Sequence, residues 1–470
     1  MALTRDQISD IVFAHLQERG RELGANLGNL LRRTDPSFKV SDYDMTSLSE
    51  LLRATVSGAV VVGRQGGDYV WALGEDLSDR DLARALLDDD DGAAEPSATG
   101  APDKVQWVTL EGFRSCKTTR LDLDDFTLLV GGNGAGKTTL LLGASYACQL
   151  NRGLTRALFS GPRDLLRIRT YGYAQPVRLT LHTTQGAEMS LEGTPDPYEP
   201  TYVLTHMTKG KKPTRWRFPP PTDQKSPPPS PTASASWPAI YLRLSPDSLA
   251  APSQLLTERP RLGFDGYGLP SVLAHLATNE PERLAKIVER IRELIPRFRR
   301  VRMPLKMEER PRFEYGVGED GHDRVQSRAS PRMLYTLEVE VEGSGWVPAD
   351  LLSEGTLFVL GIHTLLEQAT PPRIVLLDDI DRGLHPKAQQ VLMDQLSHIA
   401  KAGTQIVAST HSPYALDQIS PNAVRVVRAT AEGGTQCRKL TDHPEWSAWS
   451  GSMLAGEFWT FVGEDWLEGA

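Results

Sequence analysis

Apolar residues follow two patterns along this chain, one at helical spacing and one in short continuous runs. Between residues 3 and 73 they recur every three or four positions through three segments, and two β-prone runs at 59–62 and 69–72 then flank a glycine-rich turn. Three helices followed by a hairpin predict a small winged-helix domain at residues 1–75. Farther along, continuous apolar runs predict buried strands at 107–110, 126–130, 373–377 and 405–409.

Two stretches between these patterns predict linkers or insertions. Residues 76–104 include four consecutive aspartates, Asp88 to Asp91, followed by small and polar residues. Like charges repel and little apolar surface is present to bury, so we expect a flexible acidic linker. Residues 219–237 are rich in proline and in small polar residues, which predicts a disordered insertion.

A glycine-rich motif follows the run at 126–130 directly. It comprises Gly131, Gly132, Asn133, Gly134, Ala135, Gly136, Lys137, Thr138 and Thr139, and an apolar stretch of helix formers begins at its last residue. Strand, glycine loop and helix in this order are the setting of a phosphate-binding loop, in which backbone N–H groups turn toward the phosphates. Lys137 would reach the phosphate oxygens and the Thr138 hydroxyl would hold Mg²⁺, so the motif predicts ATP and Mg²⁺ as ligands.

Three further motifs lie downstream. Ser353 and Gly355 open an apolar helix, the run at 373–377 ends in Asp378 and Asp379, and His411 comes just after the run at 405–409. One carboxylate at a strand end can hold Mg²⁺, and a second beside it can orient an attacking water. A lone histidine is usually structural, but four motifs in this order favour one nucleotide site.

The amino-acid composition excludes some classes of protein but does not indicate a function. The chain has 470 residues, 40% hydrophobic and 24% charged, and 52 basic against 60 acidic residues give a net charge of −8. These values are ordinary for a globular protein, and the net negative charge predicts no overall basic surface for nucleic acid. Three scattered cysteines fit a reducing compartment, and no run of 18 apolar residues is present. We therefore expect a cytoplasmic protein without membrane contact.

One local basic cluster, at residues 297–306, allows two interpretations. Its members are Arg297, Arg299, Arg300, Arg302 and Lys306. They could contact nucleic-acid phosphates. Alternatively, they form a solvated face that pairs with Glu308 and Glu309, and this second interpretation is favoured.

Together these motifs resemble the ABC-type ATPases of the SMC/RecF group, and most of all the OLD-like bacterial AAA ATPases, many of which act against phages. The resemblance rests on Gly131–Thr139, Leu352–Leu357, Leu376–Pro386 and Thr410–Pro413, with Asp265–Leu269 matching the start of the helical insertion. It implies an ABC-type P-loop ATPase of α/β fold at 105–430, a helical insertion at about 265–305 and a C-terminal tail at 431–470.

The same resemblance assigns roles to individual residues. Thr138 and Asp378 would hold Mg²⁺, Asp379 would take the place of the catalytic base, and His411 would sense the γ-phosphate. The signature residues Ser353 and Gly355 would act on the nucleotide of a second subunit. Arg114 matches an arginine near the nucleotide, and Gln175 is a candidate for the Q-loop glutamine.

The N-terminal domain resembles the LOTUS (OST-HTH) family through Leu27–Leu31, Pro36–Phe38, Asp42–Tyr43 and Ser47–Leu52. That family implies either RNA contact or the docking of a protein partner. Eight basic against nine acidic residues over 1–73 give a net charge of −1, which is not a basic face. Both interpretations stay open.

Asp379 departs from the family pattern, which has glutamate at that position and thus a side chain one methylene longer. The departure affects turnover more than binding. We expect a dimeric or larger homo-oligomer that binds and slowly hydrolyses ATP, as a sensor or assembly platform in nucleic-acid maintenance or anti-phage defence. Its effector would be a separate protein, with a nuclease as one candidate and DNA or RNA as a possible further partner. The alternatives are a RecF-like DNA repair factor and an ATP-gated scaffold that barely hydrolyses.

Overall fold

A computed structural model gives the fold of the chain. It describes residues 4–19, 21–35, 38–43, 48, 51–52, 59–65, 68–73, 104–150, 168–170, 175–194, 201–208, 214–218, 239–254, 260–317, 323–367 and 372–469. The predicted linker at 76–104, except for Lys104, and the predicted proline-rich insertion at 219–237 lie outside these residues. None of the described helices is long and apolar enough to cross a membrane.

Two compact units make up the chain. The first comprises Met1–Arg243, Pro372–Asp381 and His385–Ala470, and the second comprises Leu244–Pro371 and Arg382–Leu384. The chain therefore leaves the first unit after Arg243 and returns to it at Pro372. Each unit is described by itself.

The N-terminal part of the first unit packs two helices against a small antiparallel sheet of order β1-β3-β2. Its elements are α1 (Arg5–Arg19), β1 (Arg21–Leu23), α2 (Gly24–Thr34), the 3-10 turn η1 (Val40–Tyr43), β2 (Ala59–Gln65) and β3 (Asp68–Leu73).

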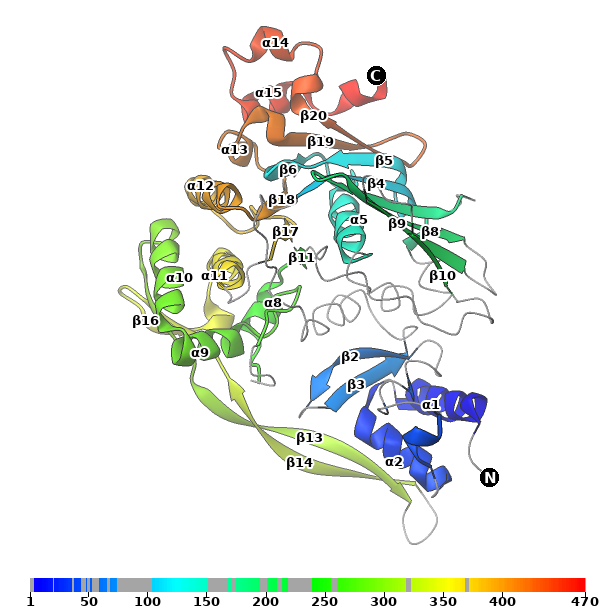
Figure 1. Cartoon of the computed structure of the whole chain (residues 1–470). Helices are drawn as coiled ribbons and strands as arrows, with labels where there is room; N and C mark the ends of the chain where they lie inside the picture. The colour runs from blue at the N-terminus through cyan, green and yellow to red at the C-terminus, as the bar shows by residue number, and fades with distance from the viewer. Residues whose placement is uncertain are drawn as a thin grey trace. The chain divides into compact units, whose positions relative to one another are not determined.

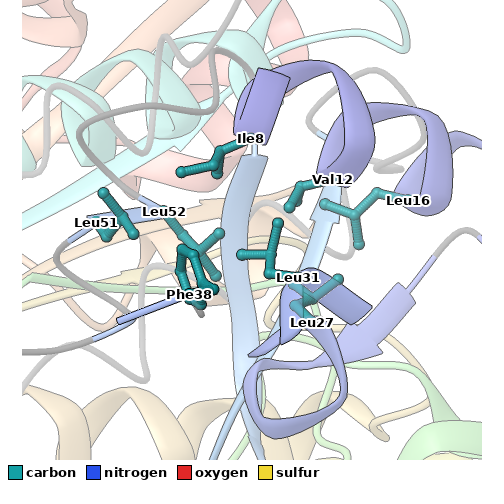
Figure 2. Packing of buried hydrophobic residues seen from close by; sticks show 8 residues of the cluster. All are labelled: Ile8, Val12, Leu16, Leu27, Leu31, Phe38, Leu51 and Leu52. Carbon is teal, nitrogen blue, oxygen red and sulfur yellow. The ribbon is translucent and has the colours of Figure 1, made fainter. Parts of the chain in front are cut away.

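Its core is formed by Ile8, Val12, Leu16, Leu27, Leu31, Phe38, Leu51 and Leu52 (Figure 2). All but Phe38 belong to the three segments of helical spacing recognised in the sequence. Of the predicted third helix, only residues 48 and 51–52 are described, and they are helical. The winged-helix and LOTUS assignments stay predictions.

A six-stranded antiparallel sheet of order β10-β9-β8-β7-β4-β5 follows. Its strands are β4 (Val105–Phe113), β5 (Cys116–Asp122), β7 (Val177–Thr183), β8 (Ala187–Thr194), β9 (Thr201–Thr208) and β10 (Thr214–Phe218). Along β7 the residues alternate between buried and half-buried, as in a strand with one face on the core. The sequence analysis predicted the strand at 107–110 and missed β7 to β10.

The second sheet of this unit is mostly parallel, with the order β11-β17-β18-β6-β19-β20 and only β20 antiparallel. Its strands are β6 (Phe126–Val130), β11 (Ala239–Leu242), β17 (Ile374–Leu377), β18 (Gln405–Thr410), β19 (Val424–Ala429) and β20 (Thr435–Lys439). Helix α5 (Lys137–Leu150) contacts strands of both sheets (Figure 1). The carboxyl ends of β6, β11, β17 and β18 therefore meet at one edge.

The C-terminal part of the chain packs beside this sheet (Figure 1). Its elements are α12 (Pro386–Lys401), α13 (Pro413–Leu416), η5 (Pro421–Ala423), η6 (Leu440–Asp442), α14 (Trp446–Trp449), α15 (Ala455–Val462) and η7 (Asp465–Gly469). Helix α15 is fixed to α13, because the Gly456 amide donates to Asp417 at 2.7 Å and a Cβ on Gly456 would lie 2.1 Å from the Pro413 carbonyl oxygen.

The second unit contains the predicted helical insertion. Its helices are α8 (Pro246–Ala250), α9 (Leu269–Asn279), α10 (Pro281–Leu294), the 3-10 turn η4 (Ala349–Leu351) and α11 (Glu354–Leu366). Its strands are β12 (Phe298–Arg302), β15 (Glu338–Val341) and β16 (Gly345–Pro348), which form one sheet, and the long hairpin of β13 (Leu305–Val317) and β14 (Asp323–Tyr335). The α/β P-loop ATPase fold class is thus confirmed, while the exact domain boundaries stay predictions.

The arginines of β12 are neutralised within their own sheet. Arg300 pairs with Glu340 at 2.7 Å, and Arg299 pairs with Glu342 at 2.6 Å. Arg302 pairs with Glu338 and lies 4.2 Å from the Trp346 ring centroid. The ion-paired interpretation of this cluster is supported, with partners that lie on β15 or just after it; the predicted pairing with Glu308 and Glu309 lies outside the described side chains.

Candidate nucleotide site

The phosphate-binding motif forms the loop between β6 and α5. Gly131 to Gly136 make the turn, Lys137 begins α5, and Thr138 and Thr139 follow in its first turn. A Cβ placed on Gly132 or Gly134 would meet nothing within 4 Å, so this side of the loop is open to a ligand. The helix N-terminus adds unpaired N–H groups and a partial positive charge that attract phosphate.

The opposite side of the loop is closely packed. Gly136 has a φ of +106°, and a Cβ there would lie 2.3 Å from the Thr435 hydroxyl oxygen of β20. A Cβ on Gly131 would lie 2.1 Å from the Val427 carbonyl oxygen of β19. The Thr435 hydroxyl is in turn bonded to Ser115 Oγ at 2.8 Å. The hairpin of β19 and β20 therefore supports the loop from beneath, and glycine is required at these two positions.

Lys137 is held over the loop with only 6% of its surface exposed. Its Nζ donates to the carbonyl oxygens of Gly131 at 2.9 Å and Gly132 at 3.1 Å. Burial lowers the pKa of Lys137, and the nearby carboxylates, led by Asp379 and Asp378, oppose that shift. A phosphate would supply the missing counter-charge, so this environment suits a polyanionic ligand.

Asp378 lies at the centre of the site, and its carboxylate accepts three hydrogen bonds and lies near one arginine. Oδ2 accepts from Thr138 Oγ1 at 2.8 Å and from the Tyr241 hydroxyl at 3.2 Å. Oδ1 accepts from Ser409 Oγ at 2.6 Å, and Arg243 Nε lies 3.9 Å from Oδ2. A hydroxyl and a carboxylate in direct contact provide the hard oxygen ligands that Mg²⁺ binds. Thr138 and Asp378 thus fit the predicted metal.

Asp379 has a φ of +54°, in the left-handed region that few residues other than glycine adopt. Its amide donates to Ser409 Oγ at 2.9 Å, and its Oδ1 lies 3.9 Å from His411 Nε2. Burial raises the pKa of Asp379, as does the negative charge of Asp378. A carboxylate with a raised pKa is a better proton acceptor, and the left-handed backbone favours aspartate over glutamate at this position.

Asp381 fixes the segment that carries the histidine. Its Oδ1 accepts from Thr410 Oγ1 at 2.7 Å and from the backbone N–H of His411 at 3.2 Å. These bonds tie the chain after β17 to the chain after β18. Asp381 therefore holds His411 beside Asp379, and its carboxylate is already engaged in that task.

Arg114 lies in the turn between β4 and β5, with a φ of +48°. Its amide donates to the Ile168 carbonyl at 2.7 Å. Its charge acts on Tyr241, although burial dominates and raises the pKa of that hydroxyl. Arg114 is thus close enough to the Asp378 cluster for its charge to be felt there. Gln175, the candidate Q-loop glutamine, precedes β7 of the antiparallel sheet. Arg243 instead follows β11, which is paired with the strand β17 that ends just before Asp378.

Ser353 and Gly355 belong to the second unit. Ser353 caps α11, accepting from the Thr356 amide at 3.3 Å. A Cβ on Gly355 would lie 2.4 Å from the Gly383 carbonyl oxygen, and Arg382 pairs with Glu354 at 3.4 Å. The start of α11 is thus packed against Arg382–Leu384, which belong to the same unit.

Sequence reasoning missed four contributors to the site, Tyr241, Arg243, Ser409 and Thr435. The first two could have been found, because Ala239–Leu242 is a short apolar run ended by an arginine, and ligands gather beyond the carboxyl ends of parallel strands. Thr435 carries no signal of its own, since its proximity to Gly136 follows only from the pairing of β19 with β6 and β20.

Comparisons with known proteins identify a family that matches more than half of this chain. The family described as "AAA domain, putative AbiEii toxin, Type IV TA system" matches residues 126–417. No curated protein matches the chain.

Several solved SMC head domains are similar to the chain. That of Thermotoga maritima is 14% identical, with a TM-score of 0.35 over 72% of this chain and 98% of that one. The head domain with a coiled coil and joint derived from Pyrococcus yayanosii is 9% identical, with a TM-score of 0.43 over 75% of this chain and 100% of that one. The Pyrococcus furiosus head domain bound to the C-terminal domain of ScpA is 12% identical, with a TM-score of 0.39 over 72% and 96%.

Proposed function

The chain belongs to this AAA-domain family, and from that premise we propose that it is an ATP-dependent switch that binds ATP with Mg²⁺ and hydrolyses it slowly. The observation that carries the proposal is the contact between Thr138 Oγ1 and Asp378 Oδ2 at 2.8 Å, next to a loop whose open side faces a ligand. A hydroxyl and a carboxylate in contact at the first turn of a P-loop helix suit a magnesium–nucleotide complex.

Binding would use the loop and the first turn of α5. Backbone N–H groups of residues 131–138 would donate to the phosphate oxygens, and the Lys137 ammonium would neutralise part of their charge. Thr138 and Asp378 would hold Mg²⁺, which when bound offsets the remaining phosphate charge. Ser409 and Tyr241, both bonded to Asp378, would keep its carboxylate oriented.

Hydrolysis would depend on Asp379 as the proton acceptor, and His411, whose Nε2 lies 3.9 Å from Asp379 Oδ1, would sense the γ-phosphate. Aspartate places its carboxylate about 1.5 Å farther back than glutamate would, the length of one C–C bond. A misplacement near that size costs on the order of 10²-fold in rate. Slow turnover and a long-lived ATP-bound state follow, which suit a switch better than a motor.

Assembly would complete the site. Helix α11 begins beside Ser353, and its N-terminal dipole would act on the γ-phosphate held by a second copy of the chain. We place this homo-oligomer, with a separate effector protein, in nucleic-acid maintenance or anti-phage defence. A nuclease is one candidate effector.

A scaffold that holds ATP without hydrolysing it is the second candidate, and the shorter Asp379 side chain favours it. Single-turnover hydrolysis separates the two, because a switch converts its bound ATP to ADP and a scaffold retains it.

Mixing two inactive variants tests the composite site. Lys137→Ala removes the phosphate-facing cation, while Ser353→Asp retains a group that can cap α11 and adds a charge that repels phosphate. A hybrid dimer of the two keeps one intact site, so an equimolar mixture should recover about a quarter of the wild-type rate. Hybrids that demonstrably form but hydrolyse no ATP would contradict the composite site.

A further inference from the structure

Three exposed apolar residues lie on the C-terminal helices α14 and α15, whose place in the fold Figure 1 shows. They are Trp449 of α14, Leu454 at the N-terminal boundary of α15, and Phe461 of α15. Their exposed fractions are 36%, 56% and 63%. The Trp449 and Phe461 ring centroids lie 6.0 Å apart, and Leu454 comes directly before the helix that carries Phe461. We call these three residues the α14–α15 surface.

The helix α15 that carries part of this surface is packed firmly against its neighbours. Phe458, one turn below on α15, is fully buried against His443 and Trp446, with ring centroids 5.2 and 5.1 Å away. The bond from Gly456 to Asp417 fixes the helix to α13. A rigid apolar surface loses little entropy when a partner binds, and aromatic anchors of this kind often dominate binding energy.

The charge around the surface identifies the kind of partner. Between residues 440 and 470 the sequence has six acidic residues and no lysine or arginine, and one of the six, Asp465, is paired with Arg428 of β19. Glu457 is exposed and accepts from the Leu454 amide at 3.1 Å, and Glu445 is exposed one turn before Trp449. An acidic rim repels nucleic acid, anionic lipid and a second copy of the same surface.

We propose that the α14–α15 surface docks an amphipathic helix of a separate protein, with apolar residues toward Trp449, Leu454 and Phe461 and lysine or arginine toward the acidic rim. Helix docking onto an apolar face, with basic residues meeting an acidic border, is an established mode of peptide recognition. None of its three residues belongs to the nucleotide site, so the inference does not rest on the proposed hydrolysis.

The test uses the full chain and a fluorescein-labelled, 14-residue helical peptide of leucine and lysine, with a leucine–glutamate peptide of the same pattern as its counterpart. Fluorescence anisotropy should give at least about tenfold tighter binding of the lysine peptide, with an affinity that falls as salt rises. The Leu454→Ser/Phe461→Ser variant should weaken it at least about tenfold, which corresponds to 1.4 kcal/mol. Serine at 454 is a favourable helix N-cap, so α15 should still form.

The matched control is Met307→Ser/Met333→Ser, which removes two methionines exposed at 67% and 49% in the other unit. It should bind the lysine peptide like the wild type. Equal binding by the Leu454→Ser/Phe461→Ser variant would show only general attraction to an acidic protein and would overturn the proposal.

Two further outcomes would also overturn it. One is co-sedimentation of the wild type, but not the Leu454→Ser/Phe461→Ser variant, with phosphatidylserine vesicles. The other is a change in oligomeric state caused by that double variant without peptide. ATP affinity is measured on the same samples, so a failure of nucleotide binding is distinguished from a failure of docking.

Discussion

Adding one methyl group to the phosphate loop should show how closely the β19–β20 hairpin supports it. In Gly136→Ala, the new Cβ would lie 2.3 Å from Thr435 Oγ1 and 2.8 Å from its Cγ2, separations that folded proteins essentially never show. The φ of +106° is also unfavourable for alanine. Backbone strain of about 1–3 kcal/mol and overpacking of about 1–3 kcal/mol together predict a loss of about 2–6 kcal/mol.

Thermal unfolding without nucleotide measures this loss. One kcal/mol shifts the midpoint by about 2–4 °C in a unit of 150–250 residues, so Gly136→Ala should lower it by at least about 4 °C. Gly132→Ala is the matched control in the same loop, because its Cβ would meet nothing within 4 Å, and its midpoint should stay within about 1 °C of the wild type.

A second substitution separates strain from overlap. Thr435→Ala removes Oγ1 and Cγ2 and leaves only a Cβ at 3.1 Å, so in the Gly136→Ala background it should restore part of the lost stability. The backbone strain at residue 136 remains, so recovery should be incomplete. Equal midpoints for Gly136→Ala and Gly132→Ala would refute the claim that β20 supports the loop.

Three other changes test separate parts of the account. Lys137→Ala should weaken ATP binding at least about tenfold by equilibrium titration, or 1.4 kcal/mol, and unchanged affinity would exclude the loop as the site. Arg425→Leu should cost about 1–3 kcal/mol, because it leaves the Asp122 carbonyl and the half-exposed Asp124 carboxylate without their buried donor, whereas Arg428→Leu, whose partner Asp465 is almost fully exposed, should cost less than about 1 kcal/mol. Asp379→Glu should destabilise the chain by about 1 kcal/mol in thermal unfolding, since glutamate tolerates a φ of +54° less well.

The elements that the sequence predicted best are those whose pattern is local. Continuous apolar runs correctly indicated β6, β17 and β18. The strand β7 was missed although Val177–Thr183 alternates apolar and polar residues, because one short alternating run carries a much weaker signal than a continuous apolar run beside a motif.

The site was predictable only where a motif carried it. Lys137, Thr138, Asp378, Asp379 and His411 are brought together as expected, because the ends of parallel strands meet at one edge. The left-handed backbone of one of them, Asp379, is a property of the folded turn that no residue spacing reveals. The loop's support by β20 depends likewise on which strands become neighbours.

The central claim is that Asp379 drives hydrolysis of ATP held by the loop, and single-turnover hydrolysis by wild type and Asp379→Asn tests it most directly. Asparagine adopts left-handed backbone readily and keeps the shape of the side chain, but its neutral amide accepts no proton. With ATP affinity verified as unchanged, the rate should fall at least about 10²-fold. Equal rates for the two proteins would show that the proton goes elsewhere and would contradict the account.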